Sequence, residues 1–184
     1  IAIIDFGSQY TQLIARRVRE LNIYSIILPH DFKDSHVDFS KIKGIILSGG
    51  PSSVYSKNSP KLNKSLISCK VPILGVCYGL QLLIEYFDGI VESGKLGEYG
   101  PSSILIKRKS ELFKNISEKT NVWMSHGDKI KNIPQDWLVT SKSDNNIISS
   151  VECEKKNIYG VQFHPEVVHT VEGIEIIKNF TLGI

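Results

Sequence analysis

The sequence has few cysteines, little excess of either charge and no long hydrophobic run. Three cysteines in 184 residues are too few for a disulfide framework and favour a reducing compartment, so we expect a cytoplasmic protein. A net charge of +3 is far from the dense positive surface of a nucleic-acid-binding protein, and we expect no nucleic-acid partner. No apolar run approaches the ~20 residues that a membrane helix requires, so we expect no membrane partner.

The remaining composition is that of an ordinary globular chain. Hydrophobic residues make up 41% and charged residues 22%. A chain of this length buries about 70% of its unfolded surface when it folds. No repeat, low-complexity tract or long linker divides the sequence, and we therefore expect a single domain over residues 1–184.

Apolar segments and their spacing predict the fold class. Continuous apolar runs predict buried strands over residues 1–5, 24–28, 44–48, 71–76 and 158–163. Helical spacing predicts helices over residues 10–21, 78–87 and 171–182. Between residues 90 and 148 the segments are short and broken by Gly, Pro, Ser and Asn, which predicts several antiparallel strands. The pattern indicates an α/β fold with three layers, in which an open, mostly parallel sheet is flanked by helices and an antiparallel section occupies the second half.

The most informative stretch is a buried strand that runs into Gly75-x-Cys77-x-Gly79 and then into a helix. This is the thiol form of the nucleophile elbow, in which the two glycines leave room for a sharp turn. The turn predicts a positive φ at Cys77 and places its sulfur at a helix N-terminus, where the dipole favours the thiolate. Cys77 is therefore the candidate nucleophile. Cys69 and Cys153 lack the glycine pattern, and we expect them to serve packing or to lie on the surface.

A thiol nucleophile requires a base whose tautomer is fixed by a third group. His164 stands at the end of an apolar strand, and Glu166 points to the same side if the segment is extended. Pro165 favours that extended conformation. His126, in a turn-like segment, is the alternative base. The other histidines are expected on the surface: His30, His36 and His169.

The glycines in Ser-Gly-Gly-Pro (residues 48–51) follow another buried strand and expose backbone N–H groups. In elbow enzymes one oxyanion donor comes from such a loop and the other from the residue after the nucleophile. Gly50 and Tyr78 occupy these positions, although a plain glycine turn has the same pattern. No Cys/His spacing fits a structural zinc site and no cluster of paired carboxylates fits another ion, so no metal ligand is predicted.

Taken together, three motifs resemble those of the class I glutamine amidotransferases: GVCYGLQ at residues 75–81, SGGP at 48–51 and QFHPE at 162–166. Within that class, the opening segment IDFGSQYTQLIARRVRE (residues 4–20) is similar to the opening of the GMP synthetase family. Further segments of that family are GGPSSVY (49–55), WMSHGD (123–128) and HPEV (164–167). The resemblance extends from residue 4 to residue 170 and covers essentially the whole chain.

The resemblance implies a complete catalytic assignment. Cys77 would attack the side-chain amide of glutamine, and Glu166 would orient His164. His164 would protonate the departing ammonia and then activate water. The N–H groups of Gly50 and Tyr78 would hold the oxyanion on the way to a γ-glutamyl thioester.

The resemblance also implies a glutamine pocket. Its residues would be Gly49, Gln81, Glu98, Ser125, His126 and Asp128. Glu98 departs from the family pattern, because Gly97 stands where an Arg commonly precedes that Glu.

The partner implied by the resemblance is an ATP pyrophosphatase domain or subunit, which adenylates XMP and receives the ammonia to make GMP. ATP and Mg²⁺ would bind to that partner, and no cofactor is implied for this chain, which lacks the partner's Ser-Gly-Gly-Val-Asp-Ser-type loop. One alternative is an amidotransferase that feeds another synthase, such as those of anthranilate or CTP synthesis; the opening segment argues against it. The other is a catalytically silent regulatory or binding module on the same fold, which the intact Cys, His and Glu argue against.

Overall fold

A computed structural model of the chain describes residues 1–94 and 97–184. Within these residues nine strands form one sheet in the order β2-β1-β3-β4-β9-β8-β7-β5-β6. The strands are β1 (Ala2–Asp5), β2 (Ile26–Pro29), β3 (Ile45–Leu47), β4 (Ile73–Val76), β5 (Ile90–Ile106), β6 (Lys119–Asn132), β7 (Leu138–Ser143), β8 (Ile148–Cys153) and β9 (Ile158–Val161). The α-helices are α1 (Thr11–Glu20), α2 (Lys64–Ser68), α3 (Tyr78–Tyr86) and α4 (Gly173–Lys178). Short helical turns are η1 (Asp34–His36), η2 (Phe39–Lys41), η3 (Glu111–Phe113), η4 (Glu154–Lys156) and η5 (Asn179–Gly183).

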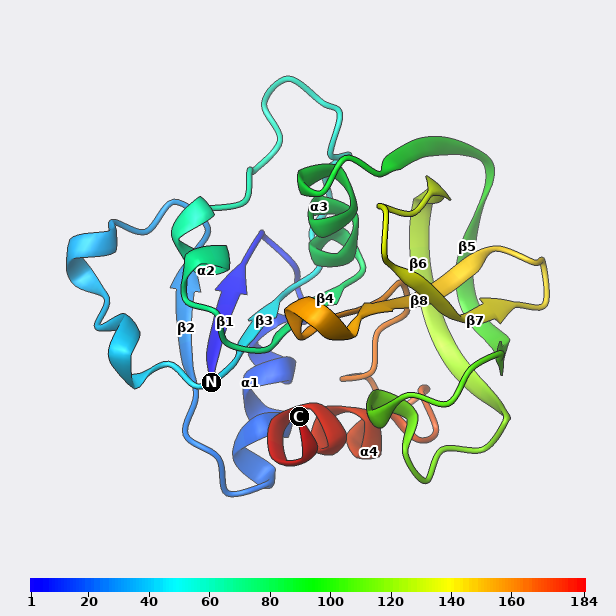
Figure 1. Ribbon diagram of the computed structural model, residues 1–184. Helices are drawn as coiled ribbons and strands as arrows, with labels where there is room; N and C mark the ends of the chain where they lie inside the picture. Colours follow the sequence, from blue (N-terminus) through cyan, green and yellow to red (C-terminus); the bar gives the residue numbers. More distant parts are fainter.

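The parallel half of the sheet consists of β2, β1, β3, β4 and β9. Successive residues of its strands enter two different cores, as Ile3 and Ile4 do, because side chains alternate across a strand. Helices α1 and α4 cover one face, and α2 and α3 cover the other (Figure 1). The predicted three-layer α/β architecture is confirmed.

The antiparallel half consists of β8, β7, β5 and β6, which continue the same sheet from β9. The predicted section of several antiparallel strands is confirmed, although β5 has 17 residues and β6 has 14, which makes them longer than the broken sequence segments indicate. A register shift between Ser93 and Glu98 interrupts the pairing without ending the strand. Pro101 is tolerated inside β5 because β7 pairs only with Ile104–Ile106, which leaves one edge of β5 free at the proline.

The loops that carry the predicted chemistry follow the carboxyl ends of adjacent parallel strands. Residues 7–10 follow β1, residues 48–51 follow β3, Cys77 follows β4 and His164 lies shortly after β9. Ligand sites of open α/β sheets lie at this edge. The sheet therefore gathers segments that are far apart in the sequence.

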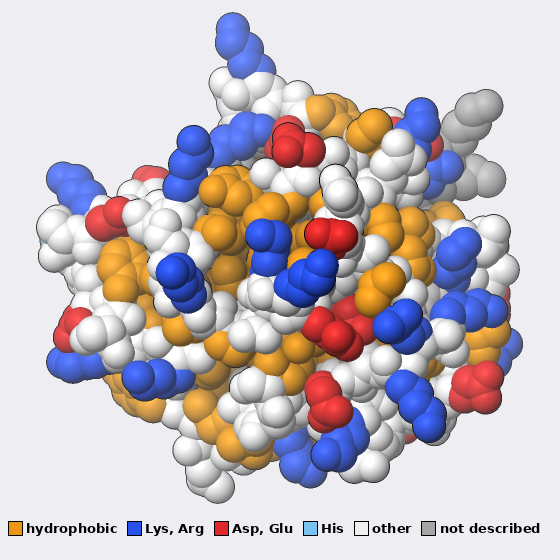
Figure 2. Space-filling model, in the orientation of Figure 1, with side chains coloured by type: hydrophobic (Ala, Val, Ile, Leu, Met, Phe, Trp, Pro, Cys, Tyr) orange, Lys and Arg blue, Asp and Glu red, His pale blue; other side chains and the backbone are white. Residues whose placement is uncertain are grey.

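The outer surface mixes charges with apolar side chains. On the face shown in Figure 2, Lys and Arg are scattered among Asp, Glu and hydrophobic residues. In residues 1–94 and 97–184, no helix is both long and apolar enough to cross a bilayer.

Candidate active site

Cys77 occupies a strained backbone position between β4 and α3. Its φ is 53° and its ψ is −107°, a conformation that non-glycine residues rarely adopt, and the predicted positive φ is confirmed. A Cβ on Gly75 would lie 2.7 Å from the backbone of Leu80, and one on Gly79 would overlap the backbone oxygen of Leu47. Both glycines are therefore required by the sharp turn.

Three buried side chains form the predicted catalytic group. Cys77 is 5% exposed, His164 is 4% exposed and Glu166 is fully buried. The Nδ1–H of His164 donates to Oε1 of Glu166 at 2.7 Å. A Cβ on Gly49 would lie 3.1 Å from Cε1 of His164 and 3.7 Å from Cβ of Cys77. The structure therefore brings together the three groups that the sequence separates by up to 89 positions.

His164 is held by its backbone as well as by Glu166. Its N–H donates to the backbone oxygen of Trp123 at 3.0 Å, and its own carbonyl accepts from Oγ1 of Thr170 at 2.6 Å. Arg17 of α1 donates through Nε to the backbone oxygen of Glu166 at 3.0 Å. These bonds hold the backbone of the segment that carries His164 and Glu166.

Burial lowers the pKa of His164, because an imidazolium loses hydration in the interior. Hydrogen bonds to Cys77 and Glu166, together with their charges, outweigh that effect and raise the pKa to about 10. The site therefore favours a protonated His164, poised to act as an acid, at neutral pH.

Gly50 and Tyr78 lie against each other beside Cys77. A Cβ on Gly50 would lie 3.3 Å from Cδ1 of Tyr78 and 2.8 Å from the backbone oxygen of Phe6. Among the described residues, neither the Gly50 N–H nor the Tyr78 N–H has an acceptor. Two backbone donors are thus available next to the sulfur, and their role as an oxyanion hole stays a prediction.

A cavity of about 320 Å³ opens on one side of Cys77. Its wall contains four of the six residues predicted for the glutamine pocket, which are Gln81, Ser125, His126 and Asp128, together with the two predicted oxyanion donors, Gly50 and Tyr78. We call it the substrate cavity. Gly49 and Glu98 do not line it.

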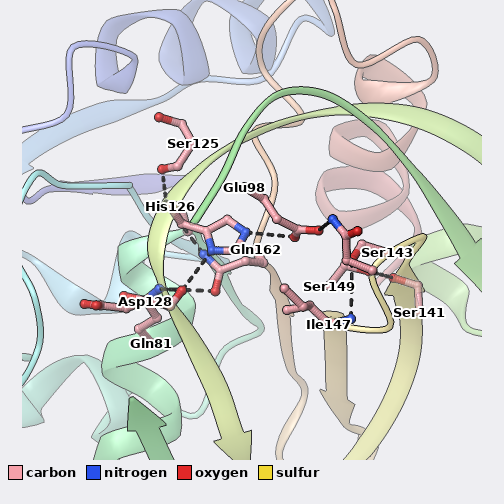
Figure 3. Close-up of polar contacts among 12 residues, drawn as sticks. Gln81, Glu98, Ser125, His126, Asp128, Ser141, Ser143, Ile147, Ser149 and Gln162 are labelled. Carbon is pink, nitrogen blue, oxygen red and sulfur yellow. Dashed lines mark hydrogen bonds and ion pairs between the residues drawn. The ribbon is translucent and has the colours of Figure 1, made fainter. Parts of the chain in front are cut away.

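The side chain of His126 is committed to other partners. Its Nδ1 lies 2.8 Å from the backbone oxygen of Asp128, and its Nε2 lies 3.2 Å from Oε2 of Glu98 (Figure 3). Because both ring nitrogens are occupied, the geometry favours His164 over His126 as the base.

Glu98 is likewise occupied by protein groups. Asn145 donates to its second oxygen at 2.9 Å, and the side chain is buried. Burial alone would raise the pKa of Glu98, but hydrogen bonds from His126, Ser143 and Asn145 hold it below its ordinary value. Glu98 does not line the substrate cavity, so its predicted place in the glutamine pocket stays a prediction.

Gln162 is buried and contacts the candidate nucleophile, although no role was predicted for it from its sequence position. Its Nε2 donates to Sγ of Cys77 at 3.6 Å. Its Oε1 accepts from Nε2 of Gln81 at 3.2 Å (Figure 3). The signal was available, because residues 162 and 164 point to the same side of an extended segment.

Two tyrosines were also missed. The ring of Tyr10 meets that of His164 edge-on, with 5.1 Å between ring centroids. The hydroxyl of Tyr55 donates to Oδ1 of Asp128 at 2.6 Å.

The other histidines and cysteines lie apart from this group. His36 and His169 are exposed as predicted, but His30 is half-buried because its ring stacks on Phe6. Cys153 is buried, and Cys69 donates its thiol to a backbone oxygen of α2. In the described part of the chain no cluster of His, Cys, Asp and Glu could hold a metal ion.

Comparisons with known proteins point in one direction. A sequence model of the family described as glutamine amidotransferase class-I matches residues 2–184. Among curated proteins, GMP synthase (glutamine-hydrolyzing) of Brachyspira hyodysenteriae is 49% identical and that of Petrotoga mobilis is 48% identical, each over 184 residues. These matches cover 100% of this chain, which spans 36% of the length of each relative.

Solved structures share the fold. A crystal structure of a Thermoplasma acidophilum protein, provisionally assigned to GMP synthase as one of its subunits, matches with a TM-score of 0.84 at 29% identity. The match covers 97% of this chain and 90% of that one. A glutamine amidotransferase from Thermotoga maritima matches with a TM-score of 0.73 at 21% identity, over 97% of this chain and 83% of that one.

Proposed function

Because the chain belongs to the class-I glutamine amidotransferase family, we propose that it hydrolyses glutamine to glutamate and ammonia at Cys77. The observation that carries the proposal is the buried, hydrogen-bonded pair of His164 and Glu166 beside Cys77, which lines the substrate cavity. A nucleophile, an acid–base group and an orienting carboxylate are the parts that amide hydrolysis through a covalent intermediate requires.

The first half of the reaction forms a thioester. The sulfur of Cys77 attacks the side-chain amide carbon of glutamine, and the developing oxyanion accepts hydrogen bonds from the N–H groups of Gly50 and Tyr78. His164 gives its proton to the amide nitrogen, the C–N bond breaks and ammonia leaves. The raised pKa of His164 supports this role, because the imidazole is protonated when the leaving group needs a proton.

The second half releases glutamate. His164, now neutral, takes a proton from water as the water oxygen attacks the thioester carbon. The C–S bond breaks, the thiolate of Cys77 returns and glutamate leaves. Glu166 keeps one ring nitrogen of His164 protonated throughout, so that the other nitrogen always faces the reacting atoms.

Replacement of the nucleophile tests the proposal. Cys77→Ala should abolish ammonia release from glutamine while the circular-dichroism spectrum stays that of the native fold. Cys69→Ala is the matched control, because Cys69 lies against α2 away from the substrate cavity, and it should retain activity. Undiminished ammonia release by Cys77→Ala would refute the assignment.

Covalent labelling separates an enzyme from a silent module. A chloroketone analogue of glutamine should alkylate Cys77, and peptide mass spectrometry locates the label. A native chain whose Cys77 resists labelling and releases no ammonia would instead be a catalytically silent module.

We further propose that the ammonia serves GMP synthesis. The relatives that are 48–49% identical are GMP synthases, and this chain corresponds to 36% of their length. An ATP pyrophosphatase domain or subunit would adenylate XMP with ATP and Mg²⁺, and ammonia would displace AMP to give GMP. Hydrolysis of glutamine itself needs no cofactor in this mechanism.

Partner stimulation tests that assignment. Addition of the pyrophosphatase partner with ATP and XMP should raise glutamine turnover, because closure against a partner completes many such sites. Glutamine turnover that does not rise, with no GMP formed, would favour a different acceptor, such as that of anthranilate or CTP synthesis.

A further inference from the structure

Cys77 lies between two cavities, of which the substrate cavity is one. The second has a volume of about 270 Å³ and is lined by residues 7–10, Gly50, Pro51, Cys77, Ser125 and His164. The two cavities share Gly50, Pro51, Cys77 and Ser125, but only the second reaches His164. The sulfur is therefore accessible from both sides, and the imidazole from one.

The second cavity leads from the buried catalytic group to the surface. Cys77 and His164 at its inner end are 5% and 4% exposed, whereas Gly7, Gln9 and Pro51 at its rim are exposed. A small molecule formed at His164 thus has a path to solvent that does not cross the substrate cavity.

The loop of residues 7–10 is a preorganised wall of this cavity. Oδ1 of Asp5 accepts from the Gly7 N–H at 2.9 Å and from the hydroxyl of Thr11 at 2.8 Å. Oγ of Ser8 accepts from the Tyr10 N–H at 3.1 Å. The loop is also part of the opening segment, which the proposed mechanism leaves without a role.

The hydroxyl of Ser8 is placed next to the reacting groups. Its Oγ would lie 3.4 Å from a Cβ on Gly49, the same point that is 3.1 Å from Cε1 of His164 and 3.7 Å from Cβ of Cys77. Within the described residues, Ser8 Oγ accepts one hydrogen bond and its own proton has no acceptor. A free O–H donor thus lines the same cavity as the imidazole of His164.

We propose that this second cavity is the path by which ammonia leaves and water arrives, and that the Ser8 hydroxyl binds both molecules through their lone pairs. The inference rests on the proposed glutamine hydrolysis. The γ-glutamyl group occupies the substrate cavity from attack until glutamate leaves, so neither molecule can pass there in between. Both proton transfers involve His164, which only the second cavity reaches.

The atoms balance along this path. When the C–N bond breaks, the amide nitrogen takes the proton of His164 and departs as neutral ammonia, which accepts a hydrogen bond from Ser8. A water molecule then takes its place, gives a proton to His164 and attacks the thioester carbon. No oxidant, metal or further reactant takes part.

A pair of blocking variants tests the path on the intact protein. Ser8→Met should fill the second cavity, and Ser53→Met should fill the substrate cavity, whose wall contains Ser53. Ser8→Met should keep the native rate of Cys77 alkylation by a chloroketone glutamine analogue and lose at least about tenfold in ammonia release. Ser53→Met, the matched control, should lose both rates together.

Ser8→Ala removes the hydroxyl without adding bulk, and it keeps the test valid if the methionine variant does not fold. It should also show native alkylation, with slower ammonia release and more thioester in acid-quenched samples. Ammonia release within twofold of native in both folded Ser8 variants would overturn the inference, and so would a parallel loss of alkylation. A native protein that neither alkylates nor releases ammonia would instead refute the proposed function, and this inference with it.

Discussion

Glu166→Gln should lower the pKa of His164 and slow ammonia release. In the native site, burial is the largest single influence and lowers this pKa, but the hydrogen bonds and charges of Cys77 and Glu166 raise it to about 10. The substitution removes the charge of one partner and leaves the burial unchanged. Less imidazolium is then available to protonate the departing nitrogen.

The size of the effect follows from the native shift. A rise from 6.5 to about 10 corresponds to roughly 5 kcal/mol of preference for the imidazolium, at about 1.4 kcal/mol per pKa unit. A neighbouring carboxylate changes a pKa by about 1–3 units, so the variant's His164 should titrate between about pH 7 and pH 9.

Stability should follow the same shift. Because the folded-state pKa of His164 lies above the unfolded value, its contribution is fully present below pH 6.5 and disappears as pH rises to about 10. At the upper limit the native protein loses roughly 5 kcal/mol of unfolding free energy over that window, and Glu166→Gln should lose less. At low pH the variant should be less stable by about 1–3 kcal/mol, because a neutral amide replaces the buried carboxylate that accepts from the protonated His164.

Histidine NMR provides the assay. The Cε1–H resonance of His164, assigned by its absence in His164→Asn, should titrate near pH 10 in the native protein and at least about one unit lower in Glu166→Gln. Glu175→Gln is the matched control, because Glu175 pairs with Lys178 on α4, and it should leave the resonance unchanged. Equal titration near pH 6.5 in native protein and variant would refute the reasoning.

Three further substitutions test the frame around the site. Cys77→Gly should have a free energy of unfolding about 1–3 kcal/mol higher than that of Cys77→Ala, because glycine relieves the backbone strain at φ 53°. Urea unfolding measures both variants, and equal stability would count against strain. Gly79→Ala should lower the free energy of unfolding in urea by more than about 2 kcal/mol, because its Cβ would overlap the backbone oxygen of Leu47. Gly183→Ala is the control and should leave stability unchanged, because the space around Gly183 is open. Similar losses in both variants would argue against a tight elbow. Thr170→Val removes the hydroxyl that donates to the backbone oxygen of His164. The variant should lower kcat more than it changes KM, and it should lower the free energy of unfolding by about 1–3 kcal/mol. An unchanged kcat would mean that His164 does not need this hydrogen bond.

The sequence predicted the parts of the site that depend on local chain geometry. The positive φ at Cys77 follows from the two glycines that flank it, and the shared side of His164 and Glu166 follows from two-residue alternation. The meeting of Cys77 with His164 was also predictable, because β4 and β9 are apolar parallel strands whose ends share one edge. These predictions required no knowledge of distant pairing registers.

Other features depend on pairing between distant segments. Glu98 and His126 are directly opposite each other on β5 and β6, because the register shifts between Ser93 and Glu98. Nothing in the local sequence fixes a bulge at that place, and hence the partner of Glu98 could not be predicted. The stacking of His30 on Phe6 likewise depends on how β1 and β2 lie side by side, as does the place of Pro29 at the end of an edge strand.

The parallel and antiparallel halves of the sheet carry different parts of the candidate site. The candidate catalytic residues Cys77 and His164 follow parallel strands, whereas Ser125, His126 and Asp128 of the substrate cavity lie on β6 of the β5–β6 hairpin. Substitutions in the hairpin can therefore change the lining of this cavity while Cys77 and His164 keep their positions at the ends of β4 and β9.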